Sequence, residues 1–232
     1  MRPVNKGESP YKNISSYQEA EPYLYERIGR YCSFCELPIF HVPEVEHKEG
    51  RHSGGELTQW ENLLYSCKYC NTRKAQKIKK GQKNRWLWPD TDNTFLAFTY
   101  ENGVPKINTE FLTSVSENVY EKAYAIFTDL KLDFYPGSPK EKDKRWCKRI
   151  ETVGIAEAAK KVWLKLKDTA YAEDELNQIL TLAESNGFFS VWMTVFHDEP
   201  KVRLALISAF PGTAKECFDQ NGNPVRRKQG NI

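Results

Sequence analysis

Two Cys-x-x-Cys pairs constrain the fold of this chain more than any other feature. They are Cys32 with Cys35, and Cys67 with Cys70. Two intervening residues let both thiolates of a pair face one ion, and four thiolates make the closed tetrahedral set of a structural zinc site. Such a set leaves no open position for a reaction. The pairs therefore predict a zinc ion that holds two distant segments together, while the residues between them form structure of their own.

Three other interpretations of these cysteines are open: four unrelated thiols, a redox Cys-x-x-Cys, or iron–sulfur ligation. The segment Met1–Gly7 contains no apolar core of a secretory signal, so we expect a cytoplasmic location. In that compartment, paired cysteines bind metals more often than they form disulfides. Cys147 and Cys217 stand alone, and we interpret them as ordinary thiols without a role.

The composition indicates a soluble protein with a sizeable core. A length of 232 residues allows one large domain or two small ones. Hydrophobic residues make up 40% of the chain, so a sizeable core can form. The mean hydropathy is −0.67. The longest apolar stretch, near residues 187–196, is too short to span a bilayer, so we expect no membrane partner.

The basic residues are unevenly distributed along the chain. The net charge is only +3, but residues 68–85 contain eight basic side chains and no acidic one. A solvated helix face often explains such a run. Here the run begins at the second cysteine pair, which favours contact with phosphate groups. Arg73, Lys74 and Lys77 are the candidate nucleic-acid-binding residues.

Further polar residues lie between and beside the cysteine pairs. Glu46 and His47 form an acidic-His dipeptide, Asn62 lies in the Trp-Glu-Asn-Leu block, and Asn71 directly follows Cys70. Over about residues 31–80 this order resembles the HNH endonuclease family, also called His-Me finger or ββα-metal nucleases. The resemblance implies a strand with the acidic-His dipeptide packed against a helix that carries the Asn.

The resemblance also implies a role for each of these residues. His47 would be the general base, because its neutral imidazole near pH 7 takes a proton from water. Glu46, in place of the family's usual Asp, and Asn71 would hold a catalytic Mg²⁺ or Mn²⁺ through oxygen atoms. Asn62 would brace the loop and the orientation of His47. The longer Glu side chain leaves open which of the two cations is preferred.

Local patterns predict the elements and the domains. We expect strand-compatible residues at 44–47, a hairpin of 95–100 with 104–107, and helices at 21–30, 58–64, 71–80, 116–130, 152–167, 172–185 and 199–210, the last capped by Asp198. The predicted class is α+β, with a small zinc-stapled ββα-metal core followed by a mainly helical C-terminal region. The predicted units are an N-terminal arm and short helix at 1–30, a nuclease domain at 31–108, and a helical, partner-docking domain at 109–232.

Four short segments extend the resemblance to the whole chain. Residues 1–7, 31–36, 60–63 and 210–213 are similar to the HNH subunit of Septu-type antiphage systems, including retron-associated versions. This resemblance implies a partner ATPase of the ABC/SMC-like type. In the retron-associated versions it also implies a reverse transcriptase with its RNA–DNA product. Whether DNA or an RNA such as tRNA is cut stays open.

Two other functions are compatible with parts of this pattern. A non-catalytic zinc module that binds nucleic acid or protein would use the same cysteines and the same basic run. Such a module has no need of Glu46, His47 and Asn71. A stand-alone restriction-type HNH enzyme is a third possibility, although no helix-turn-helix or further zinc finger is visible in the sequence.

Overall fold

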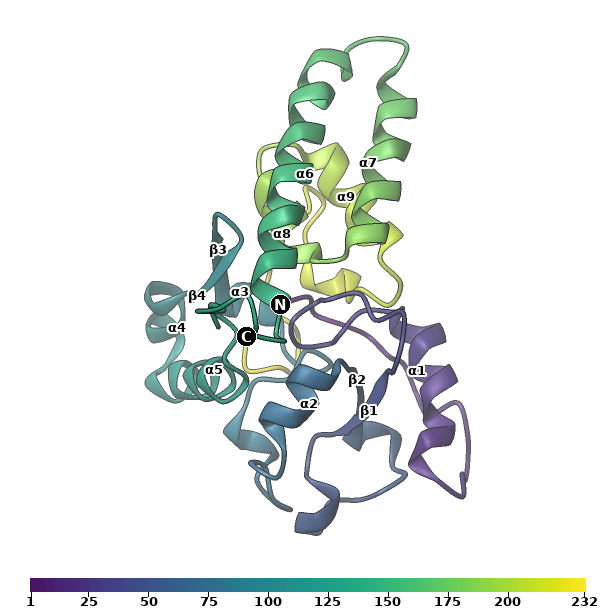
Figure 1. The fold of residues 1–232 in the computed structure, drawn as a ribbon, viewed down its shortest axis with the longest axis vertical. Coiled ribbons are helices and arrows are strands. Elements are labelled where there is room, and N and C mark those ends of the chain that lie inside the picture. The colour runs from purple at the N-terminus through teal and green to yellow at the C-terminus, as the bar shows by residue number, and fades with distance from the viewer.

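A small ββα unit carries the sequence motifs. In the computed structural model of residues 1–232, strands β1 (Glu44–His47) and β2 (Leu63–Ser66) pair antiparallel. Helix α2 (Lys68–Lys74) follows β2 after the single residue Cys67 and contacts β1 (Figure 1). Every residue of β2 is buried. The unit thus has the strand-pair-and-helix order that the motif implied.

Two helix predictions in this unit were wrong. Residues 58–64 form a 3₁₀ turn, Trp60–Asn62, and then the strand β2. A short apolar run does not distinguish a buried strand from a helix, because both faces of a buried strand are apolar. Helix α2 also begins before residue 71, at Lys68, and ends at Lys74 rather than near residue 80. Ala75, at φ 44°, stops it, since that conformation cannot continue a right-handed helix.

The N-terminal segment is extended, as expected, but it is not a loose arm. Val4 forms a bridge with Thr213, and the Arg2 guanidinium donates to the Ile28 carbonyl at 2.7 Å. Lys6 is buried and donates to the carbonyls of Trp60 and Leu63. The segment leads through a 3₁₀ turn at Tyr17–Ala20 into α1 (Glu21–Ile28), so it is held between parts of the chain that are far apart in sequence.

The predicted hairpin is confirmed, although its first strand is shorter. Strands β3 (Phe98–Glu101) and β4 (Val104–Ile107) pair antiparallel around Asn102 and Gly103. Both turn residues have positive φ, at 47° and 78°, as a two-residue type I′ turn requires. The short helix α3 (Thr94–Ala97) precedes the hairpin, and α4 (Thr109–Val115) and α5 (Glu117–Leu130) follow it.

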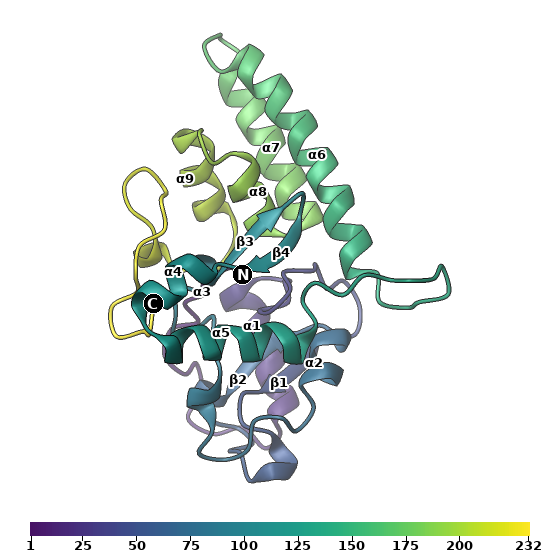
Figure 2. The ribbon, with the colours of Figure 1, turned by 90° about the vertical axis from the view of Figure 1, so that its left-hand side faces the viewer.

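Four helices form the C-terminal region. They are α6 (Arg145–Leu166), α7 (Ala172–Asn186), α8 (Phe189–Val195) and α9 (Pro200–Ala209). Helices α6 and α7 form a long antiparallel pair whose tip extends away from the ββα unit (Figures 1 and 2). Helix α8 was not predicted, and α6 begins at Arg145 rather than at the predicted residue 152. Asp198 does not cap α9, because Glu199 occupies the N-cap position and no side chain caps that helix end.

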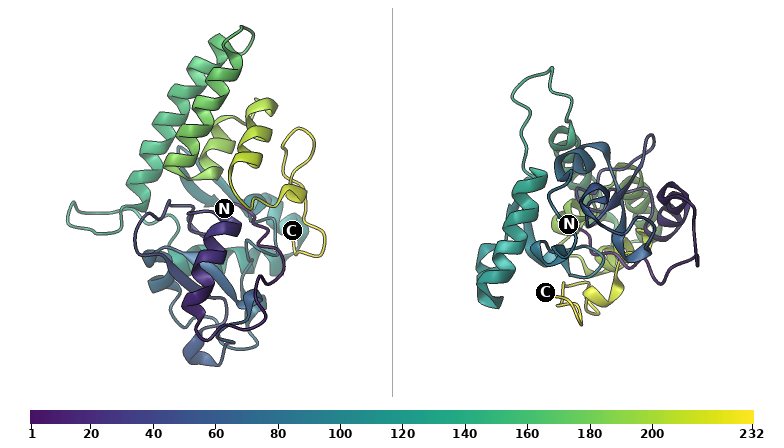
Figure 3. Two further views of the ribbon diagram at one scale, coloured as in Figure 1. Left: turned by 90° about the vertical axis from the view of Figure 1, so that its right-hand side faces the viewer. Right: turned by 90° about the horizontal axis from the view of Figure 1, so that it is seen from below.

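The hydrophobic core has two main clusters. The first contains Phe34, Trp60 and Trp86, together with Ala123 and Ile126 of α5. Helix α5 therefore packs on the nuclease-like half. The second cluster joins α6 to α9 through residues that include Trp163, Ile179, Trp192 and Leu206. Both chain ends lie near the junction of these two parts (Figure 3).

The α+β class with a helical C-terminal region is confirmed. The residue limits predicted for the domains stay a prediction. No helix combines the length and apolar character that crossing a bilayer requires.

Candidate active site beside a four-cysteine cluster

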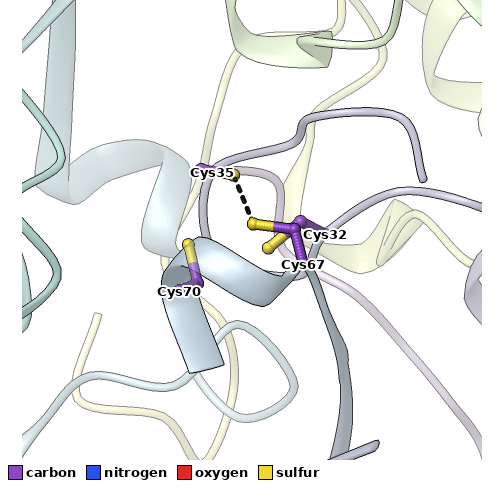
Figure 4. A group of neighbouring side chains, drawn as sticks. All are labelled: Cys32, Cys35, Cys67 and Cys70. Atoms are coloured by element: carbon purple, nitrogen blue, oxygen red, sulfur yellow. Dashed lines mark hydrogen bonds between the residues drawn. The ribbon is translucent and has the colours of Figure 1, made fainter. Parts of the chain in front are cut away.

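The four paired cysteines converge on one point. Cys32 and Cys35 come from the loop after α1, and Cys67 and Cys70 come from the start of α2 (Figure 4). All four are buried, and their sulfur atoms lie within 4.8 Å of one another. The Cys35 and Cys67 sulfurs are 3.7 Å apart. Tetrahedral Zn–S bonds of about 2.3 Å place sulfurs about 3.8 Å apart, so the cluster fits a structural zinc ion.

The surroundings of the cluster join it to the helical region. Arg145, at the start of α6, donates from Nη1 to the Cys70 sulfur at 3.3 Å. The buried carboxylate of Glu36, in the loop of the first pair, accepts from the backbone N–H of Ser190 in α8 at 2.9 Å. The two parts of the molecule thus meet at the cysteine cluster.

The two remaining cysteines differ from this cluster. Cys217 is buried, and burial raises the pKa of its thiol to about 12. Cys147 is half-buried, and neither forms a disulfide. That neither thiol has a role stays a prediction.

His47 is held in one orientation at the end of β1. Its Nε2 lies 2.9 Å from the carbonyl oxygen of Leu57. A carbonyl only accepts, so Nε2 carries the proton and a neutral ring keeps a free lone pair on Nδ1. The Tyr17 ring packs edge-on against the imidazole, with centroids 4.8 Å apart. Burial lowers the pKa of His47, which favours the neutral, proton-accepting form.

Glu46 is a buried carboxylate with one unsatisfied oxygen. Its Oε1 lies 3.1 Å from Nζ of Lys74, whose side chain is fully buried. Its Oε2 is buried and has no hydrogen-bond partner. Burial raises the pKa of Glu46 to about 7, although Lys74 opposes that shift. An orphaned carboxylate oxygen beside a cavity is the kind of ligand that a hard divalent cation takes.

Asn71 of α2 faces the same strand but contacts a different residue. Its Nδ2 donates to Oε2 of Glu44 at 3.0 Å, and Lys68 donates to Oε1 of Glu44 at 2.8 Å. Glu44 was not among the predicted site residues. The signal was present, because residues two apart in a strand share a face, and Glu44 and Glu46 therefore both face α2.

These side chains line one cavity of about 120 Å³. Glu44, Glu46, His47 and Asn71 contribute to it, and Arg51 and His52 add basic groups. Arg51 is held by a hydrogen bond from Nη1 to the Tyr17 hydroxyl at 2.6 Å. A larger cavity of about 410 Å³, between the β3–β4 hairpin and helices α6 and α8, is also lined by a carboxylate, an amide and an imidazole, but by none of the polar residues that lie between or beside the cysteine pairs. The smaller cavity is therefore the candidate active site.

Asn62 closes the loop that orients His47. Its Oδ1 accepts from the Glu49 N–H at 2.9 Å, and its Nδ2 donates to the carbonyls of Glu49 and Glu56. The side chain is fully buried. These bonds hold the loop whose Leu57 carbonyl contacts His47, and the bracing role of Asn62 stays a prediction.

The three predicted phosphate contacts are engaged elsewhere. Lys74 is buried behind Glu46 rather than exposed on a helix face. Arg73 pairs with Asp143 at 2.7 Å, and Lys77 with Asp129 at 2.9 Å. Burial and these ion pairs disfavour phosphate contact by Arg73 and Lys74. Lys77 is 40% exposed and keeps access to solvent.

Comparison with known proteins addresses the central segment. No curated protein and no solved structure matches the chain. The family model described as HNH endonuclease matches residues 32–77. This range contains all four clustered cysteines, Glu46, His47, Asn62 and Asn71. Residues 32–77 are therefore similar to the HNH endonuclease domain, which supports a nuclease.

Proposed function

We propose that this protein is a metal-dependent endonuclease that hydrolyses phosphodiester bonds in nucleic acid. The observation that carries the proposal is a single cavity, within the matched domain, lined by His47, Glu46 and Asn71. A base, a carboxylate and an amide oxygen are the groups that a one-metal hydrolysis of a phosphodiester requires. A pure binding module has no use for this combination.

His47 is the proposed general base. The Leu57 carbonyl fixes the proton on Nε2, so Nδ1 accepts a proton from the attacking water. The water oxygen then forms a bond to phosphorus while the bond to the leaving oxygen breaks. Tyr17 restricts the imidazole by edge-on packing, and Asn62 holds the loop that supplies the Leu57 carbonyl. These contacts maintain the ring in one orientation.

The residues beside His47 fit a divalent cation. Glu46 would bind it through the unpartnered Oε2, and Asn71 through Oδ1, since its Nδ2 is already bonded to Glu44. When bound, Mg²⁺ or Mn²⁺ supplies Lewis-acid activation of the phosphate and stabilises the leaving oxygen. The buried Lys74 balances the charge of Glu46 from the opposite side.

The biological setting follows from the whole-chain resemblance. We propose that the nuclease is the toxic effector of a Septu-type or retron-associated antiphage system in the cytoplasm. Its partners would be an ABC/SMC-like ATPase and, in retron-associated systems, a reverse transcriptase with its RNA–DNA product. The helical region from residue 109 onward is the proposed docking part. DNA and tRNA are both retained as substrates.

A cleavage assay tests the catalytic proposal. Purified protein is incubated with plasmid DNA or total tRNA in Mg²⁺, Mn²⁺ or EDTA. His47→Ala is compared with His197→Ala, which changes an exposed histidine outside this cavity. We expect metal-dependent cleavage that falls by about 10²- to 10⁴-fold in His47→Ala only. Undiminished cleavage by folded, zinc-loaded His47→Ala would refute the assignment.

Two alternatives make different predictions in the same experiment. A non-catalytic zinc module would bind nucleic acid but leave it intact in every metal, also when the partner ATPase is present. A stand-alone restriction-type enzyme would cut without any partner. Co-purification of a large ATPase with the native protein would favour the defence system over the stand-alone enzyme.

A further inference from the structure

The loop between the zinc cluster and β1 presents apolar side chains to solvent. Phe40 is 59% exposed and Val42 is 71% exposed. Val42 has a φ of 54°, in the left-handed region that a β-branched residue rarely adopts. Exposed apolar side chains on a conformationally strained loop often mark a binding site.

The Phe40 ring contacts a guanidinium group and is otherwise largely exposed. The Arg30 guanidinium stacks on it, with Cζ 4.7 Å from the ring centroid, and Arg30 is itself anchored to the Glu184 carbonyl. Phe40 and Val42 line a hollow of about 260 Å³ together with Lys68 and Tyr69. No carboxylate lines this hollow. A flat apolar ring with a cation behind it is suited to stack on a nucleobase.

The hollow is connected to the candidate active site. Lys68, which lines the hollow, donates to Glu44 of the active-site cavity at 2.8 Å. Phe40 precedes Glu44 by four residues, which an extended chain spans in at most about 14 Å. Phosphates of one strand follow one another every 3.4 Å or so along the axis of duplex DNA, and an extended single strand spaces them further apart, so this value gives an upper limit on the number of nucleotides spanned. A base stacked on Phe40 therefore belongs to a nucleotide within roughly four positions of the bond that is cut.

We propose that Phe40 is a stacking platform for an unpaired nucleobase of the substrate strand, with Val42 as its apolar edge and Lys68 beside the backbone phosphates. The proposal rests on the proposed nuclease function and specifies its substrate. Stacking requires a base whose face is free, so the preferred substrate has a single-stranded or unpaired stretch next to the cut. Phe40 would then be a positioning and specificity residue, not a catalytic residue.

Binding to catalytically inactive protein tests the platform separately from cleavage. In a His47→Ala background, Phe40→Ala, Phe40→Trp and Tyr171→Ala are compared by fluorescence anisotropy. The probes are labelled 20-nucleotide single-stranded DNA, single-stranded RNA and duplex DNA. Tyr171 is the matched control, because it is a 65% exposed aromatic residue just before α7, away from the site. Zinc content and thermal unfolding verify that each variant is folded.

The platform predicts a selective loss. Phe40→Ala should weaken single-strand binding by about 5- to 150-fold, Phe40→Trp should preserve it, and duplex binding and Tyr171→Ala should change little. Single-strand binding by Phe40→Ala as tight as by its parent would overturn the platform while the nuclease function stands. That outcome combined with lost capture of a protein partner would assign the loop to protein docking instead.

The active enzyme provides a second readout. The wild type is incubated with a series of substrates, each lacking one base at a different position. The platform predicts that removal of the base at one position, within about four nucleotides of the cut, slows cleavage. In Phe40→Ala, removal of that base should no longer slow cleavage. Equal cutting of all these substrates would overturn the platform. A wild type that neither binds nor cuts any nucleic acid, with its partner present, would instead refute the proposed function itself.

Discussion

Removing the guanidinium of Arg145 should loosen the zinc cluster and the helical region together. This side chain is 2% exposed and donates to the Cys70 sulfur at 3.3 Å, to Asp143, and to the carbonyls of Leu130 and Lys131 at the end of α5. The negative sulfurs and Asp143 raise the pKa of Arg145 despite its burial, so it is charged at every relevant pH. The variant to make is Arg145→Met, which has a similar length without the charge.

The size of the effect follows from what is left unpaired. Loss of one partner of a buried ion pair costs about 3–5 kcal/mol. Here Arg73 also pairs with Asp143 at 2.7 Å and donates to the Leu130 and Lys131 carbonyls, so those groups keep one donor. We therefore expect Arg145→Met to lose stability at the lower end of this range, about 3 kcal/mol. For a chain of this size, that loss corresponds to a fall in Tm of about 6 to 12 °C. Cys70 keeps no substitute donor, and loss of such an outer contact typically lowers metal affinity about 10- to 100-fold.

Denaturant unfolding and zinc release to a chelator measure the two effects. Arg73→Met is the matched control, because its guanidinium shares Asp143 and both carbonyls but does not contact the cysteines. It should lose stability while keeping the zinc affinity of the wild type. If Arg145→Met and Arg73→Met released zinc at the same chelator concentration as the wild type, the coupling through Cys70 would be refuted.

Three further predictions concern the cysteine cluster, the loop after β1 and a buried ion pair. Cys67→Ser should release zinc and unfold the N-terminal half, seen by metal analysis and circular dichroism; a stable variant that retains zinc would contradict the cluster assignment. Gly55→Ala should disrupt the loop, because its Cβ would lie 2.1 Å from the Glu49 carbonyl oxygen. Gly54→Ala should cost only about 1 kcal/mol of stability, because its Cβ would meet only the Lys80 side chain. Equal Tm values for the two variants would refute this difference. Asp90→Asn should cost about 3 kcal/mol, because two buried lysines lose their anionic partner, although Lys6 keeps its two carbonyl acceptors. Burial raises the pKa of Asp90, but Lys48 and Lys6 outweigh it and lower the pKa, so its contribution is present above about pH 4 and is lost as pH falls further; acid titration of Asp90→Asn should lack that loss.

Sequence spacing was sufficient where the chemistry is local. The paired cysteines, the Glu46–His47 dipeptide and the position of Asn71 directly after Cys70 follow from residues close together in the chain. The Asn-Gly hairpin was predictable for the same reason, since two residues determine its turn. Strand β2 was not, because its buried apolar residues carry no period that separates strand from helix.

Charge patterns were a weaker guide than spacing. The basic run after the second cysteine pair predicted exposed cations, yet Lys74 is fully buried beside Glu46. A local pattern does not reveal which face of a short helix the rest of the chain will cover. The same limit concealed Glu44, which the sequence places in the right strand but without its partner Asn71.

The sequence by itself determined the candidate donor set of this protein: four paired cysteines, a histidine, a carboxylate and an amide, each at the spacing that the proposed chemistry requires. Only the tertiary structure decided how these groups are supported. Arg145 reaches Cys70 across 75 positions of the chain, and Glu36 reaches Ser190 across 154. Contacts of such range depend on how the helical region packs on the ββα unit. Burial makes them strong, and burial is a property of the whole fold, not of any short stretch of residues.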